Sequence, residues 1–267
     1  MEADLNGEYL HAGGIQATEF LLKQIKLTPG QRVLDIGCGT GATLVNLKTQ
    51  FLCNIFAVDI SLAMLKRAAH KVQPFSQASL VQADAATKML PFSANTFDVI
   101  LAESVAGILD FASALPEWIR VLKPGGTLAL NDGLWQKGTS SSTIKKFTNL
   151  CEQKFGFSLA PSTYQSINEW KDLLTSAGLI NIRTSCAAVQ GNVLPRNAET
   201  CRKRRHAILI RPHLWPAYLR YRRAMQHFKE VGDYLEYWII LAKKPVSLRH
   251  DPSDKIASSA KNTSVTR

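Results

Sequence analysis

The residues best suited to chemistry stand where a short apolar run, residues 33–36, meets a loop rich in glycine. Three glycines alternate in this loop: Gly37, Gly39 and Gly41. Their lack of side chains lets backbone N–H groups approach a ligand closely, as nucleotide-type cofactors require. Asp35 lies inside the apolar run and can hold a polar ligand group beside the loop. Together with Ala42, the loop also fits the dinucleotide pattern G-x-G-x-x-A, so it leaves the cofactor open.

Acidic residues recur at the ends of further short apolar runs. Asp59 ends residues 54–59, where a carboxylate suits the two hydroxyls of a ribose. Asp84 stands near the end of residues 80–85, and Glu103 closes the run of residues 90–103, which carries the chain into a fourth strand. A helix end and a Pro-Gly-Gly turn at residues 124–126 then lead to a fifth run. Strands that alternate with helices form parallel sheets with ligand sites at their carboxyl ends, so these acids are expected to lie together.

The order of these motifs resembles the class I S-adenosylmethionine-dependent methyltransferases over roughly residues 9–135. It is most similar to the group of ubiquinone/menaquinone C-methyltransferases and small-molecule methyltransferases. Members share the acid at Asp84, the Leu-Pro-Phe segment at 90–92 and the Leu-Lys-Pro-Gly-Gly segment at 122–126, which dehydrogenases usually lack. The resemblance implies S-adenosylmethionine as cofactor, S-adenosylhomocysteine as product and no metal. A non-catalytic protein that only binds S-adenosylmethionine is the alternative.

The resemblance also implies which residues meet the cofactor. The expected set is Tyr9, Asp35, Gly37, Cys38, Gly39, Gly41, Asp59, Ile60, Met64, Asp84, Ala85, Glu103 and Ser104. In members of the family the glycine loop faces the methionine part, with Asp35 near its ammonium group. Asp59 would bind the ribose, and Glu103 and Ser104 would pass close to the sulfonium carbon.

The adenine end of the cofactor is expected at three residues. Ile60 and Met64 would flank the base, and Asp84 would accept a hydrogen bond from its amino group. Plain packing of Met64 within its helix is an alternative for that residue.

Methyl transfer from a sulfonium depends on alignment and on removal of one proton from the acceptor. His11 and Glu103 are the candidate catalytic residues, because an imidazole titrates near neutral pH and Glu103 lies at the fourth strand end. Tyr9 and Asp132 compete for roles at the acceptor, and a structural role remains open for His11. The expected acceptor is a small, hydrophobic organic molecule that is methylated on carbon or oxygen.

The motifs and the hydrophobic periodicity predict one α/β architecture. It is a Rossmann-like doubly wound sheet of seven mostly parallel strands, with helical insertions after the fifth and sixth strands. Helices are expected at 17–25, 61–72 with Ser61 as N-cap, 116–122, 143–155 and 166–177, and the last two strands at 180–189 and 234–242. The domain organisation is a lead-in at 1–30, a cofactor-binding core at 31–135, a sheet completion with an acceptor cap at 136–244, and a disordered tail at 245–267.

The insertion at residues 191–233 is strongly basic. Between Cys201 and Lys229 there are nine Lys or Arg residues and no acid, in a chain of net charge +11. An apolar stripe recurs there at helical spacing: Leu214, Tyr218, Tyr221, Met225 and Phe228. The stripe either packs on the sheet or makes a peripheral membrane contact through 201–229. Nucleic acid is disfavoured because residues 102–105 lack the Asn/Asp-Pro-Pro-aromatic motif of enzymes that methylate base amino groups.

Composition places the chain among cytoplasmic globular proteins, with a membrane surface as an alternative location. No apolar run approaches the ~18 residues of a membrane span, and the acidic start, Met1 to Asp4, is unlike a signal peptide. The five cysteines never show C-x-x-C spacing, which favours reduced thiols and no zinc site.

Overall fold

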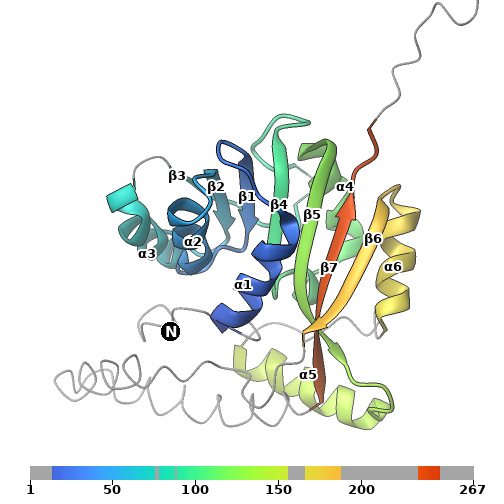
Figure 1. The fold of residues 1–267 in the computed structure, drawn as a ribbon. Coiled ribbons are helices and arrows are strands. Elements are labelled where there is room, and N and C mark those ends of the chain that lie inside the picture. The colour runs from blue at the N-terminus through green and yellow to red at the C-terminus, as the bar shows by residue number, and fades with distance from the viewer. Residues whose placement is uncertain (1–13, 76–77, 88, 156–165, 188–233, 247–267) are drawn as a thin grey trace, which may run out of the picture.

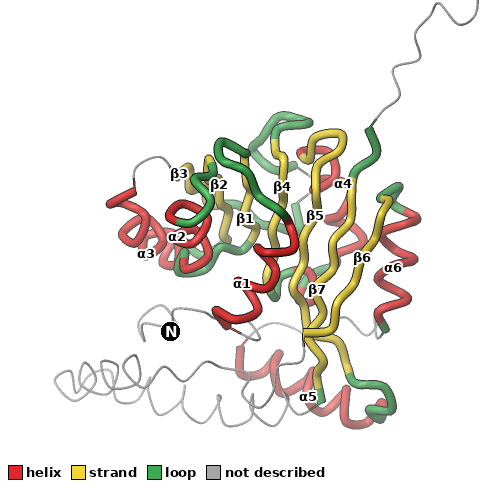
Figure 2. Tube along the Cα trace, viewed as in Figure 1, coloured by secondary structure: helices red, strands yellow, loops and turns green. Residues whose placement is uncertain are grey.

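A seven-stranded sheet with helices on both faces forms the centre of the molecule (Figures 1 and 2). The computed structural model describes residues 14–75, 78–87, 89–155, 166–187 and 234–246. Its strands are β1 (Arg32–Ile36), β2 (Asn54–Asp59), β3 (Ala78–Gln82), β4 (Phe97–Glu103), β5 (Leu122–Trp135), β6 (Ile180–Ala187) and β7 (Leu235–Lys243). They lie in the order β3-β2-β1-β4-β5-β7-β6, and only β7 runs antiparallel to its neighbours. The expected fold class is confirmed.

The helices divide between the two faces of this sheet. One face packs α1 (Gly14–Ile25), α2 (Ala42–Thr49) and α3 (Leu62–Val72) into a core with the side chains of Val33, Val99 and Ala129. The other face packs α4 (Phe111–Val121) and α6 (Ile167–Ser176), through Trp118 and Trp170, onto Leu34, Ile100 and Leu128. In Figure 1, α5 (Ser141–Phe155) lies at the bottom of the view, at the level of the lower end of β7. Short 3₁₀ turns, η2 (Gln73–Phe75) and η3 (Ala106–Ile108), complete the described elements.

Local signals explain the starts of three helices. The Ser61 hydroxyl accepts the N–H of Met64, which confirms Ser61 as the N-cap of α3. Ser166 and Glu169 form a capping box at the start of α6. The helix predicted to contain residues 116–122 is α4, which begins earlier, after its N-cap Asp110, and has Pro116 inside it.

Two strand boundaries differ from the sequence predictions. The third strand ends at Gln82, because Asp84 begins a turn in which its carboxylate accepts the N–H of Ala86 at 2.9 Å. The fifth strand is much longer than residues 127–130 and starts at Leu122. Two backbone hydrogen bonds with Lys244 hold the Pro-Gly-Gly segment in the sheet. The Gly125 N–H donates to the Lys244 carbonyl, and the Lys244 N–H donates to the Gly126 carbonyl.

Several expectations fall on residues that the structure does not describe. Tyr9 and His11, the basic insertion at 191–233 and the tail from residue 247 onward are among them. Within the described ranges, no helix has the length and apolar character that crossing a membrane would require.

Candidate active site

The carboxyl ends of the central strands bring three predicted acids together. Asp35 on β1 pairs in register with Leu101 of β4, and Glu103 lies at the end of β4 on the same face. Asp59 ends β2 on the other side of β1. Asp84 follows β3, the strand that pairs with β2, and its side chain is exposed.

The glycine loop is built by hydrogen bonds within the chain. The amides of Gly37 and Cys38 both donate to the Val58 carbonyl, at 2.8 and 3.1 Å, and the Gly41 amide donates to the Cys38 carbonyl at 2.9 Å. The Gly39 amide donates to Asp59 Oδ2 at 2.8 Å. These four N–H groups therefore shape the loop, whereas the sequence predicts that backbone N–H groups of this loop face a ligand.

Two of the glycines are required by neighbouring protein atoms. A Cβ at Gly37 would lie 2.3 Å from a methyl group of Val105, in the loop after β4, and φ there is +73°. A Cβ at Gly41 would lie 2.8 Å from the Cβ of Ala68 on α3, and φ there is +78°. Close packing of the loop against these neighbours is thus a reason for glycine at both positions, in addition to any contact with a cofactor.

Asp59 connects the glycine loop to the start of α3. Its Oδ2 accepts the Gly39 N–H, and its Oδ1 accepts the Ser61 N–H at 2.8 Å. Each carboxylate oxygen has a second lone pair, so the group keeps capacity for further donors such as ribose hydroxyls.

Glu103 is the centre of a buried hydrogen-bond network with a 9% exposed side chain. Its Oε2 accepts the hydroxyl of Thr18 on α1 at 2.8 Å and the amide of Asn131 on β5 at 3.4 Å. Its Oε1 accepts the hydroxyl of Thr43 on α2 at 2.8 Å. These three partners could not be predicted from the sequence, because Thr18 and Thr43 lie 85 and 60 residues from Glu103 and follow no motif.

The electrostatics of this edge favour a positively charged ligand group. Burial, and then the negative charges of Glu103 and Asp59, raise the pKa of Asp35 well above its ordinary value. Carboxylates that repel one another in a buried place gain stability when a cation binds beside them. The site can therefore hold an ammonium or sulfonium group.

The remaining predicted residues lie around this centre. Cys38 is buried, and burial raises the pKa of its thiol, which keeps it neutral. Ile60 is 66% exposed at the end of β2, and Met64 is half-buried in the first turn of α3. Ser104 has a left-handed φ of +57°, unusual outside glycine, and its N–H donates to the Asn131 carbonyl. Ala85 follows the exposed Asp84.

Asp132, a rival candidate for the catalytic base, faces the other side of the sheet from Glu103. Side chains alternate along β5, and Asn131 takes the Glu103 side. Asp132 Oδ1 accepts the Gly107 N–H of η3 at 3.2 Å, whereas Oδ2 has no hydrogen-bond partner in the described part of the chain. Burial raises the pKa of Asp132 to about 7. Its position on the opposite face of the sheet argues against a direct role beside the three acids.

Among the described residues, no group of three or more His, Cys, Asp or Glu side chains has the arrangement of a metal site. The predicted absence of a metal stays a prediction.

Comparisons with known proteins identify the chemistry. A family described as a methyltransferase domain matches residues 34–130. The uncharacterised methyltransferase YodH of Bacillus subtilis is 31% identical over 174 residues, which are 63% of this chain and 68% of that protein. A demethylmenaquinone methyltransferase of Corynebacterium urealyticum is 36% identical over 109 residues, 40% of this chain and 44% of that enzyme.

A solved structure shows the same fold. Haemonchus contortus phosphoethanolamine N-methyltransferase 2, in complex with S-adenosyl-L-methionine, superposes with a TM-score of 0.65 at 23% identity. The match covers 89% of this chain and 54% of that one, so the chain spans about half of the length of that enzyme. Motif order, sheet topology, the acidic edge and the likeness to YodH agree, and the chain belongs to the class I S-adenosylmethionine-dependent methyltransferases.

Proposed function

We propose that this methyltransferase acts on a small, largely apolar organic acceptor and methylates it on carbon or oxygen. The observation that carries this proposal is an aromatic surface just beyond Glu103. Trp135 on β5 and Tyr237 on β7 are both buried on the face of the sheet that carries Asn131 and Glu103. Leu235 pairs with Trp135 in register and continues this surface.

The Tyr237 ring lies over the β5 backbone. A Cβ at Gly133 would approach the ring at 3.2 Å from Cε1, next to the hydroxyl-bearing carbon. Burial raises the pKa of the Tyr237 phenol, which keeps it a neutral hydrogen-bond donor. Neither the Tyr237 hydroxyl nor the Trp135 indole N–H has a hydrogen-bond partner among the residues that the structure describes. An apolar acceptor with one oxygen would suit two such donors between apolar walls.

The cofactor would lie along the carboxyl edge, from β4 to β3. Asp35 and Glu103 would hold the cationic methionine and sulfonium end. Asp59 would bind the ribose while it supports Gly39, and Asp84, with Ala85, would meet the adenine beside Ile60 and Met64. This placement is supported by the adjacency of the three buried or half-buried acids.

The activities of the named relatives favour small-molecule acceptors. One relative is a demethylmenaquinone methyltransferase, and the enzyme of the solved structure is a phosphoethanolamine N-methyltransferase. The aromatic surface favours the first kind of acceptor, because a phosphate ester would need charged donors rather than a phenol and an indole.

The test offers the enzyme two acceptors with S-adenosylmethionine: a naphthoquinol with a short prenyl chain, and phosphoethanolamine. We expect S-adenosylhomocysteine and a C- or O-methylated naphthoquinol, detected by mass spectrometry. Tyr237→Phe should weaken that turnover. The control is Tyr234→Phe, because Tyr234 is 41% exposed and lies just before β7. N-methylation of phosphoethanolamine alone would overturn the proposal.

We further propose that the helical insertions within residues 136–244 form the cap over the acceptor. In the described part of this range, α5 follows β5 in the chain, and its Phe147 ring contacts the ring of Tyr234 at 5.4 Å between centroids. His11, Tyr9 and the membrane contact through 201–229 remain predictions on residues outside the described ranges. Sedimentation with anionic vesicles tests the membrane contact, which requires binding at low salt and release at high salt.

A further inference from the structure

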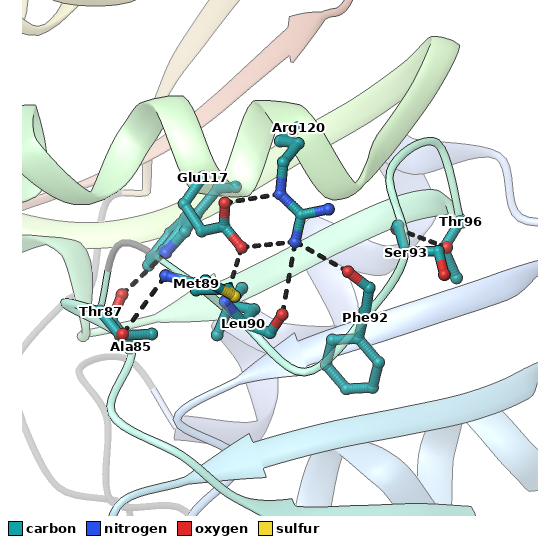
Figure 3. A network of polar contacts seen from close by, with 10 residues as sticks. Ala85, Thr87, Met89, Leu90, Phe92, Ser93, Thr96, Glu117 and Arg120 are labelled. Carbon is teal, nitrogen blue, oxygen red and sulfur yellow. Dashed lines mark hydrogen bonds and ion pairs between the residues drawn. The ribbon is translucent and has the colours of Figure 1, made fainter.

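Side chains of α4 reach across to the chain that connects β3 to β4. Figure 3 shows the contacts as one network between Ala85 and Phe92. The indole N–H of Trp118 donates to the Ala85 carbonyl at 3.0 Å. The carboxylate of Glu117 accepts the Leu90 N–H at 2.6 Å. An irregular connection of this kind needs such partners for its backbone polar groups.

Arg120 completes the network from the next turn of α4. One of its guanidinium nitrogens donates to the carbonyls of Leu90 and Phe92, at 3.3 and 2.7 Å. The guanidinium also binds both carboxylate oxygens of Glu117, at 2.6 and 2.7 Å. The hydrogen bond from Arg120 lowers the pKa of Glu117, so the pair stays charged and its geometry stays fixed.

This network begins one residue after Asp84. The turn at Asp84 is held on its other side by the Ala83 N–H, which donates to the Asp59 carbonyl at 3.2 Å. Trp118 itself is fully buried, with its ring 5.1 Å from that of Phe111. The two neighbours of the exposed Asp84 are therefore both held by hydrogen bonds: Ala83 to the end of β2, and Ala85 to the buried Trp118 of α4.

We propose that Glu117, Trp118 and Arg120 are positioning residues for the adenine end of the cofactor. They hold the backbone at Ala85, Leu90 and Phe92 and so determine where the Asp84 carboxylate meets the adenine amino group. The inference rests on the role proposed above for Asp84. It adds a contribution of α4, a helix on the opposite face of the sheet from α2 and α3, to cofactor recognition.

The test measures ligand selectivity. Calorimetry compares S-adenosylhomocysteine with an analogue whose purine lacks the 6-amino group. Trp118→Phe keeps an aromatic ring in the core but removes the donor to Ala85. It should weaken binding of S-adenosylhomocysteine about fivefold, because a displaced Asp84 would lose its hydrogen bond to the adenine amino group, and one ordinary hydrogen bond has about this effect. The analogue cannot use Asp84, so its affinity should stay the same. Arg120→Lys, at a residue whose side chain is 37% exposed, should show the same pattern without disturbing the core.

Trp170→Phe is the matched control. Trp170 is also fully buried and stacks on Phe111, at 5.3 Å between centroids, but it lies on α6. It should lower thermal stability and leave the selectivity of the protein intact. The inference would be overturned if Trp118→Phe weakened the binding of both ligands equally, or if Trp170→Phe lost the selectivity between them. If the unmodified protein binds both ligands equally, the role of Asp84 fails together with the inference, while methyl transfer itself is untouched.

Discussion

Asp35 and Glu103 lie on neighbouring parallel strands and point to the same face of the sheet, and the charge of Glu103 helps to raise the pKa of Asp35. Thr18, Thr43 and Asn131 all donate to Glu103, whereas burial is the largest cause that acts on Asp35. The two neighbouring acids therefore have different surroundings: Glu103 already accepts three hydrogen bonds, whereas Asp35 gains most when positive charge arrives.

Binding of S-adenosylmethionine should release protons from the enzyme. The cationic ligand favours ionised Asp35, so binding lowers a pKa that burial had raised. Below that raised pKa, affinity should increase by up to about tenfold per pH unit, and it should level off above it. Calorimetry in two buffers of different ionisation enthalpy counts the released protons.

Asp35→Asn is the control for this linkage. The variant cannot titrate at residue 35, so its heats of binding should be the same in both buffers. A proton release that persists in Asp35→Asn would assign the linkage to another group.

Glu103→Gln should reduce discrimination between substrate and product cofactor. Only S-adenosylmethionine carries the sulfonium charge, whereas both cofactors carry the ammonium. Loss of the carboxylate charge should weaken S-adenosylmethionine binding about tenfold and S-adenosylhomocysteine binding less. Glutamine can still bond to the hydroxyls of Thr18 and Thr43. Parallel losses for the two ligands would place Glu103 away from the sulfonium.

The sequence was sufficient to predict the sheet, because acids and glycines mark the ends of the strands and segments with helical periodicity separate the strands. It placed Asp35, Asp59 and Glu103 at one edge, as the structure has them. It could not predict the partners of Glu103 or the contacts of α4 with Ala85, since these join residues far apart in the chain without a motif. It also assigned Gly37 to the ligand, although contact with Val105 is visible only in three dimensions.

Gly37→Ala should destabilise the protein more than Gly30→Ala. Both glycines have positive φ, at +73° and +80°, so both substitutions carry about 1–2 kcal/mol of backbone strain. At Gly30 a Cβ would meet nothing within 4 Å, whereas at Gly37 it would clash with Val105 and add about 1–3 kcal/mol. Urea denaturation measures the difference.

Val105→Ala should partly rescue Gly37→Ala. It removes the methyl group at 2.3 Å and leaves the Val105 Cβ at 3.4 Å, an ordinary contact distance. The double variant should therefore be less destabilised than the sum of the single ones. Strict additivity would show that the clash is relieved elsewhere.

The stability of the ligand-free protein should fall as pH rises from about 4 to 7. Burial raises the pKa of Asp132 to about 7, whereas an unfolded aspartate titrates near 4. The folded state then binds its proton more tightly, so this stabilisation is complete below about pH 4 and is lost as pH rises through 7. Three pKa units correspond to about 4 kcal/mol. Asp132→Asn should remove most of this slope, measured by urea denaturation across the pH range, and Asp35 would account for a remaining slope of the same sign.

Asp98→Asn supplies a control of opposite sign. Burial alone would raise the pKa of Asp98, but hydrogen bonds from the Lys123 ammonium and the Arg32 N–H outweigh burial and lower it. Asp98 therefore contributes stability above its unfolded pKa that is lost as the solution becomes acidic. Asp98→Asn should flatten the acid side of the profile and leave the fall between pH 4 and 7 in place. A profile that Asp132→Asn does not change between pH 4 and 7 would mean that the Asp132 carboxylate is ionised throughout, held by the N–H groups of η3.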